Sequence, residues 1–221
     1  MDVLADVIAA VRNGRAVASR TVGRSPWGLR FGDPVGMVFH VVVSGSCWLT
    51  LSDLDPVRLD AGDVVLLPEP GPHTLSDRPG APSVDFGDVV DELDEPIGGL
   101  VIGGDGPAVE LLCGAYLVHR SGSHPLLRAM PEMIHLRAHG AARSSSMGAT
   151  VALLAEEVQR QDPGAAIVIG ALVDALLVHI VREGFAQVGD GWVHALSDPP
   201  IADALSAIHA DPSAPWTVQQ L

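Results

Sequence analysis

The chain has 221 residues, and 48% of them are hydrophobic, which is enough for a substantial core in one large domain or two small ones. The formal net charge is −14 and all thirteen basic residues are arginines, which excludes this chain as a cationic phosphate-binding surface for nucleic acid. The two cysteines, Cys47 and Cys113, lie far apart and no secretory signal is recognisable, so we expect a cytoplasmic protein with free thiols.

Short strands are predicted from about Val17 to Leu75, after an amphipathic amino-terminal segment. Runs of Val, Phe and Trp alternate there with clusters of Gly, Pro and Asp, at the spacing of an all-β sandwich or barrel. Six carboxylates follow between Asp85 and Glu95, and we interpret them as a mobile solvated loop in preference to a calcium site. The stretch PAVELLCGAYLVH then predicts a returning strand.

Two helices are predicted next. The first is capped near Ser144 to Ser146 and places four apolar residues on one face: Met147, Val151, Leu154 and Val158. The second begins after Asp162 and Pro163, and its most apolar part, Ala165 to Val181, is short for a bilayer span and contains Asp174 and His179. Strands followed by helices predict an α+β fold.

The second helix is apolar on almost every side, so one small β-domain cannot cover it completely. We therefore predict a homodimer in which a second copy supplies the remaining cover. The interface candidates are Val168, Leu172, Leu176 and Ile180.

The last part of the chain begins with a Gly-rich linker, Gly184 to Trp192. Asp198 then caps a predicted helix with a stripe of Ile201, Leu205 and Ile208. Thr217 and Gln220 form a capping box for another helix, of which only one further residue follows, so we expect a truncated product.

These final residues carry a family resemblance. The stretch GDGWVHALSDPPIADALSAIHADPSAPWTVQQL resembles the start of the DNA-binding domain of AraC-type transcription regulators, with the pattern W-x-x-x-L-x-D-P-x-I-x-x-A-L followed by P-W-T-V-x-x-L. Upstream, FHVVVSGSCWLTL, VRLDAGDVVLLPEPGPH, LLCGAYLV and HPLLRAMPEMIHL resemble the cupin-type sensor half of one subgroup of that family.

The resemblance implies four parts. They are a cupin-like jelly-roll β-barrel over residues 1–122, a helical dimerisation region over 123–185, a linker over 186–197 and a truncated DNA-binding domain over 198–221. It implies that the chain is the effector-sensing or dimerising half of a transcription regulator. DNA would be bound through helix-turn-helix modules that this chain lacks, and no membrane is involved.

The resemblance also locates the ligand positions of cupin enzymes. The second cupin motif, G-x5-P-x-G-x2-H, is nearly complete, with Gly62, Pro68 and His73, although Pro70 stands where glycine is usual. The first motif retains only His40, because Val38 occupies the place of the glutamate ligand. A site of three histidines and one glutamate for iron or manganese is thus ruled out.

A zinc site remains an alternative. Thiolates and imidazoles suit zinc, which could be held by His40, Cys47, His73 and Cys113 if the barrel brings them together. The alternative is two buried apolar thiols and two hydrogen-bonded core histidines. A further loose group, without recognisable ligand spacing, consists of His119, His124, His135 and His139.

The interior of the predicted barrel is also the expected effector pocket. The residues proposed to line it are Trp27, Phe31, His40, Trp48 and His73, each of which could equally be plain core. Two other functions stay open: a stand-alone metal-dependent cupin enzyme, such as an isomerase or dioxygenase, and a dimerisation module without an effector.

Overall fold

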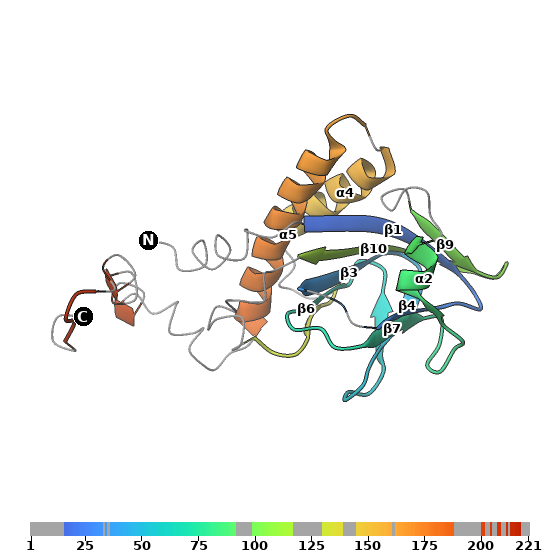
Figure 1. Cartoon of the computed structure of the whole chain (residues 1–221), viewed down its shortest axis with the longest axis horizontal. Helices are drawn as coiled ribbons and strands as arrows, with labels where there is room; N and C mark the ends of the chain where they lie inside the picture. Colours follow the sequence, from blue (N-terminus) through green and yellow to red (C-terminus); the bar gives the residue numbers. More distant parts are fainter. Residues whose placement is uncertain are drawn as a thin grey trace.

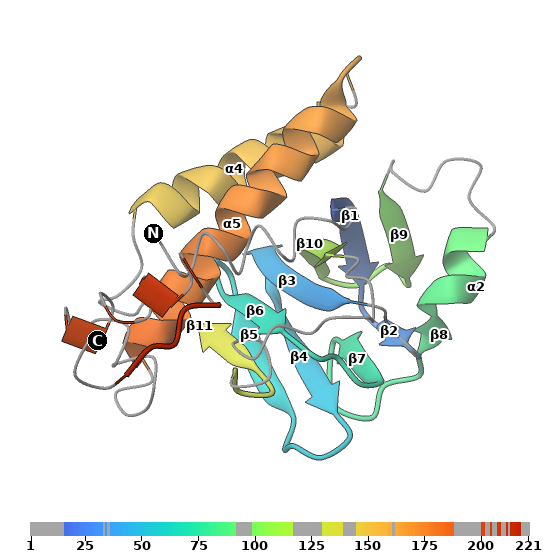
Figure 2. The same cartoon turned by 60° about the vertical axis from the view of Figure 1, so that its left-hand side comes forward.

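The computed structural model describes residues 16–32, 34, 36–91, 99–116, 130–138, 145–160 and 162–187, with isolated residues between 200 and 217. Two β-sheets pack face to face, and a helical hairpin covers the outer face of one of them (Figures 1 and 2). This is the α+β architecture that the sequence predicts, with a jelly-roll-like barrel followed by helices. The predicted boundary at residue 122 lies outside the described residues.

Most neighbouring strands in the two sheets are antiparallel. The six-stranded sheet has the order β11 (Ile134–Leu136), β6 (Val64–Leu67), β3 (Met37–Ser44), β10 (Ala108–Tyr116), β1 (Ala16–Arg24) and β9 (Leu100–Gly103). The five-stranded sheet has the order β5 (Val57–Asp60), β4 (Ser46–Leu51), β7 (His73–Ser76), β2 (Gly28–Phe31) and β8 (Val84–Asp85). The edge strands β9 and β8 pair in parallel with β1 and β2.

The six-stranded sheet is buried on both faces. On β10, Leu111 and Cys113 point into the barrel between the two sheets, whereas Leu112 and Tyr116 face the helices. Residues of β3 and β6 alternate in the same way, as expected for strands whose side chains change face at every residue. The molecule therefore has two apolar cores, one inside the barrel and one under the helical hairpin.

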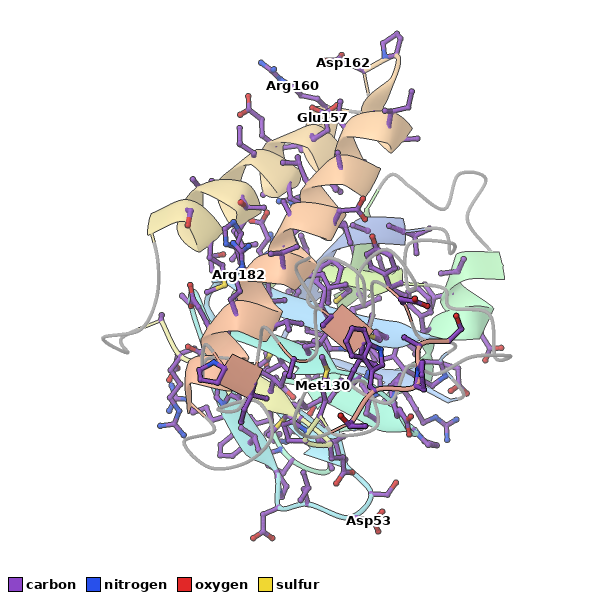
Figure 3. All side chains as sticks on the ribbon, turned by 90° about the vertical axis from the view of Figure 1, so that its left-hand side faces the viewer. Asp53, Met130, Glu157, Arg160, Asp162 and Arg182 are labelled. Carbon is purple, nitrogen blue, oxygen red and sulfur yellow. The ribbon has the colours of Figure 1, made fainter. Side chains whose placement is uncertain are left out.

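The hairpin consists of α4 (Ser145–Arg160) and α5 (Ala165–Gln187). The predicted stripe of α4 is confirmed, because its four apolar residues all lie in the core beneath the helices: Met147, Val151, Leu154 and Val158. Glu156 and Arg160 pair on the solvent side, with 3.3 Å between their charged atoms. Figure 3 shows Arg160 and Asp162 near the tip of the hairpin, at the opposite end of the molecule from Asp53.

Helix α5 is longer than the sequence predicts. It continues to Gln187, through the first residues of the predicted linker, and its carboxyl-terminal part packs on β11. Gly184 permits this packing, since a Cβ there would lie 2.7 Å from Ile134 Cγ2. The remainder of the predicted linker lies outside the described residues.

The same helix contains the one described segment that is long and apolar enough to cross a membrane. Residues 165–184 have a mean hydropathy of 2.1, so the expectation that this segment is too short for a bilayer does not hold. Length and composition alone are weak evidence, however. The segment packs on α4, β1 and β11, and seven of its side chains are in the core: Ala165, Ile169, Val173, Leu176, Leu177, Ile180 and Val181.

The carboxylate-rich segment is not wholly a loop. Residues 86–91 form the short helix α2 (Phe86–Asp91), while 92–98 lie outside the described residues. Asp85 anchors its start by a two-oxygen ion pair with Arg30, in which Arg30 Nε lies 2.7 Å from Asp85 Oδ1. Phe86 stacks on Phe31 of the barrel core. The run of carboxylates predicted a loop here, because the sequence alone does not show the aromatic contact and the ion pair that stabilise this helix.

Candidate functional site

Three polar side chains meet inside the barrel. His40 on β3 and Cys113 on β10 are direct cross-strand neighbours, and His40 Nδ1 lies 3.2 Å from Cys113 Sγ. His73 reaches them from β7 in the opposite sheet, with its Nε2 atom 3.0 Å from His40 Nε2. The other ring nitrogen of His73, Nδ1, lies 2.9 Å from the carbonyl oxygen of Gly71. A continuous hydrogen-bonded chain thus links Cys113, His40, His73 and Gly71, and we call it the interior chain.

The direction of each hydrogen bond in the interior chain follows from its last acceptor. A carbonyl oxygen only accepts, so His73 Nδ1 carries a proton and donates it to Gly71. In a neutral His73 the Nε2 atom is then an acceptor, and His40 Nε2 must be the donor to it. His40 Nδ1 is left as the acceptor for the thiol of Cys113. Neutral groups therefore satisfy every ring nitrogen of this chain.

Burial favours the same neutral forms. Desolvation, and secondarily the neighbouring His73, hold the pKa of His40 well below its ordinary value. Burial also lowers the pKa of His73, although its hydrogen bond to Gly71 acts in the opposite direction. The pKa values of Cys47 and Cys113 are raised to about 12, chiefly by desolvation. At neutral pH none of these four side chains carries a charge.

The interior chain ends beside a hydroxyl group that has no oxygen or nitrogen partner. Thr21 on β1 is fully buried, and its Oγ1 atom makes no hydrogen bond of ordinary geometry. A hydrogen bond from Thr21 lowers the pKa of the Cys113 thiol against the larger effect of burial, but sulfur is a weak acceptor and leaves the hydroxyl without a partner of ordinary geometry. A buried hydroxyl without a partner costs on the order of 1–3 kcal/mol. This atom is therefore a candidate contact for a bound molecule.

Phe31 covers the imidazoles of the interior chain. Its ring stacks on His73 with 4.8 Å between centroids and an interplanar angle of 13°. It also lies against His40, with 5.2 Å between the ring centroids. On its other side it stacks on Phe86, which is only partly buried. The aromatic stack thus runs from the barrel interior to the surface at helix α2.

The structure brings together three members of the proposed zinc set but not in a metal-binding arrangement. His40 presents opposite ring nitrogens to Cys113 and to His73, so one ion cannot bind all three through these atoms. Cys47 is buried inside the same barrel as a free thiol. Within the described part of the chain, no group of three or more His, Cys, Asp or Glu side chains is placed to hold a metal. The geometry favours hydrogen-bonded core residues over a four-ligand zinc cluster.

Of the proposed pocket residues, only some face the barrel interior, because side chains along a strand alternate between its two faces. Phe31, His40 and His73 line the barrel, as expected. Trp48 does not, because Cys47 and Leu49 on either side of it point inward and Trp48 therefore points outward. Trp27 is 3% exposed, but it packs against Gly23 and Gly103 and behaves as core.

The loose histidine group is reduced to one described member. His119, His124 and His139 lie outside the described residues. His135 on β11 donates to the buried carboxylate of Asp63, with 3.0 Å between Nε2 and Oδ2. Its described contacts are those of a structural hydrogen bond.

Comparison with known proteins places this arrangement in a family. The cupin family matches residues 2–186, which cover the barrel and the helical hairpin. A putative AraC-like transcription regulator of Streptomyces antibioticus is 30% identical over 226 residues, covering 100% of this chain and 73% of the relative. The chain belongs to the cupin-bearing AraC-type transcription regulators.

Other relatives of this AraC-type chain agree. A second putative AraC-like regulator, from Streptomyces lividans, is 29% identical over 225 residues, again covering 100% of this chain and 73% of the relative. Among solved structures, unsaturated fatty acid bound ToxT of Vibrio cholerae is similar with a TM-score of 0.44 and 10% identity. That match covers 91% of this chain and 65% of ToxT. The barrel and hairpin lie within the cupin match and within the part of the chain that aligns with the two Streptomyces regulators.

Proposed function

We propose that the barrel binds a small-molecule effector, that the helical hairpin pairs two protomers, and that DNA is bound by the helix-turn-helix part that the family implies. The observation that carries the sensing role is the interior chain together with the unpartnered hydroxyl of Thr21. An apolar core gains nothing from a buried hydroxyl without a partner, whereas a binding site uses one to orient its ligand.

The alternative of a metal-dependent cupin enzyme has less support. His40 and His73 use their ring nitrogens on each other, on Cys113 and on Gly71, which leaves no free lone pair for an ion. The similar proteins are named as transcription regulators. We infer a non-enzymatic, cytoplasmic protein, and the two buried free thiols are compatible with a reducing compartment.

Homodimerisation is proposed from the exposed apolar residues of the hairpin. Ile167 is 79% exposed, Val168 is 43% exposed and Leu153 on α4 is 55% exposed. Of the four interface candidates, Val168 is exposed and Leu172 is partly buried. Leu176 and Ile180 are at most 1% exposed and belong to the core of their own protomer, so they offer a partner no surface. The proposed interface is therefore the part of α5 near the hairpin tip.

Thermal unfolding of the purified chain against a panel of small molecules tests the sensing role. A binder selective for the folded state at about 100 times its Kd stabilises it by about 2.7 kcal/mol. In a chain of this size that corresponds to a rise in Tm of about 5 to 10 °C. Metal analysis of the same sample separates the alternative, since stoichiometric iron or manganese with turnover would contradict the regulatory role of the barrel.

A further inference from the structure

The described groups that line the barrel interior are all uncharged. The titratable groups among them are His40, His73, Cys47 and Cys113, and Thr21 is a hydroxyl. Neutral imidazoles satisfy every hydrogen bond of the interior chain, and the remaining described lining is aliphatic or aromatic. Among the described residues, the interior offers hydrogen bonds without a countercharge.

The buried carboxylate of Asp63 does not supply one either. Its oxygens already accept hydrogen bonds from the amide of Asp60, the amide of Ala138 and the imidazole of His135. A carboxylate satisfied in this way has little capacity left to bind a cationic ligand. An ionised ligand placed inside the barrel would thus lose its hydration without gaining an opposite charge, which is strongly unfavourable.

From this juxtaposition we propose that the effector is an uncharged, largely apolar molecule with one hydroxyl or carbonyl group that hydrogen-bonds Thr21. This deepens the proposed sensing function and rests on it. Thr21 can donate to a carbonyl and can both donate to and accept from a hydroxyl, so either group satisfies it. The apolar part of the ligand is held by the aliphatic and aromatic lining.

The position of Thr21 indicates where the ligand enters. Thr21 pairs with Leu100 of the edge strand β9, and β8 is the corresponding edge of the other sheet. Helix α2 follows β8 directly and lies at this side of the sandwich (Figures 1 and 2). Phe86 at the start of α2 is the outer ring of the stack on Phe31. Displacement of Phe86 would expose Phe31 and, behind it, the imidazoles of the interior chain.

The substitution Thr21→Val separates ligand binding from folding. Valine has nearly the same shape and removes only the hydroxyl, which makes no regular hydrogen bond in the protein. The variant should therefore unfold at the same temperature as the wild type or a higher one. Thr50→Val is the matched control, since Thr50 lies on β4 at an alternate position to the inward Leu49 and Leu51.

The experiment uses the full chain and probes matched in size. Two sets of probes are used, one with a linear scaffold and one with a single ring. Each set contains an alcohol, a ketone, a carboxylate and an ammonium compound. Thermal unfolding and titration calorimetry should show binding by the alcohol or the ketone and none by the two ions. Thr21→Val should weaken that binding about tenfold, as expected for one neutral hydrogen bond. Thr50→Val should leave it unchanged.

The remaining outcomes are distinguishable. Stronger binding of a carboxylate or an ammonium compound would overturn the inference about charge while the sensing function stands. Equal binding by wild type and Thr21→Val would overturn the role of Thr21. If no member of either set shifts the unfolding temperature, both the inference and the proposed sensing function are contradicted.

Discussion

Asp63 and His135 join the barrel to the strand that supports helix α5. Asp63 stands just before β6 and His135 lies on β11, and the two strands are paired. Besides His135, Asp63 accepts a hydrogen bond from the amide of Ala138 at 2.8 Å and one from the amide of Asp60 at 3.1 Å. Because α5 packs on β11, the carboxylate fixes the element that lies between the barrel and the hairpin.

Replacing Asp63 by asparagine should lower stability and change its dependence on pH. Burial opposes ionisation of Asp63, but the hydrogen bonds from Ala138, His135 and Asp60 outweigh it and lower its pKa below the ordinary 3.8. Its contribution is therefore fully present above about pH 5 and is lost as pH falls through the lowered value. We expect Asp63→Asn to cost about 1–3 kcal/mol at pH 7, measured by denaturant unfolding.

The acid limb of this experiment provides the stricter test. The difference in unfolding free energy between the wild type and Asp63→Asn should stay constant above about pH 5 and shrink below the ordinary value of 3.8. Asp60→Asn is the control, because the Asp60 side chain is 55% exposed and pairs only with Arg58 on the surface among its described contacts. A difference that did not change with acid would mean that Asp63 is not ionised in the folded protein.

The interior chain predicts specific histidine tautomers. His73 should carry its proton on Nδ1 and His40 on Nε2. Burial lowers both pKa values from the ordinary 6.5, so both rings should be neutral at neutral pH, and His40 should stay neutral well below pH 6.5. Nitrogen chemical shifts of the imidazoles report the tautomer and the charge directly. A charged His40 at pH 6, or the opposite tautomer in either ring, would contradict the hydrogen-bond directions on which the neutral interior depends.

The same lowered pKa values set the sign of a stability effect. As pH falls below 6.5 the unfolded chain binds protons at these histidines before the folded chain does, so folding is destabilised by acid. Wild-type stability should thus begin to fall near pH 6.5, well above the range in which Asp63 acts. Two separate acid limbs in a plot of unfolding free energy against pH would identify the two contributions.

The sequence predicted the class of fold and part of the site, because both depend on short repeating patterns. The alternation of side chains along one strand was enough to predict that His40 faces the barrel interior. The spacing from Gly62 to His73 located the second imidazole. The same alternation also shows that Cys47 and Trp48, being adjacent, cannot both face inward, so the misplacement of Trp48 was avoidable.

Other features could not be predicted from local pattern. Thr21 lies in a predicted strand, but only its pairing with Leu111 and Leu100 across two neighbouring strands shows that its hydroxyl faces the interior without a partner. Leu176 and Ile180 could not be separated from the exposed residues of α5, since an all-apolar helix has no sequence signal for which side its own protomer covers.

Removing metal ions should leave the protein unchanged. The described imidazoles and the thiol of the interior chain are occupied by one another, so we expect a chelator to withdraw no ion from these residues. Thermal unfolding with and without an excess of a zinc chelator should give the same Tm within error. A drop of several degrees, together with zinc in the untreated protein, would restore the metal site as the explanation for these residues.

The helical hairpin offers a direct test of dimerisation. Its tip projects beyond the barrel (Figures 1 and 3), and Ile167 near that tip is 79% exposed, so the protomer itself does not cover it. If a second copy does, Ile167→Asp places an unpaired carboxylate in an apolar interface and should weaken the dimer at least a hundredfold, which is about 2.7 kcal/mol. The stability of the separated protomer should change by no more than about 0.5 kcal/mol.

A buried residue of the same helix is the matched comparison. Leu176 is fully buried in its own protomer, so Leu176→Ala should cost about 2–5 kcal/mol of folding stability through the cavity it leaves, with little direct effect on association. Sedimentation over a range of concentrations measures association, and denaturant unfolding measures stability. If the proposed interface is correct, Ile167→Asp lowers association and Leu176→Ala lowers folding stability. A protein that sediments as a monomer at every concentration would contradict the proposed homodimer. An Ile167→Asp variant that associates like the wild type would place the pairing surface away from the hairpin tip.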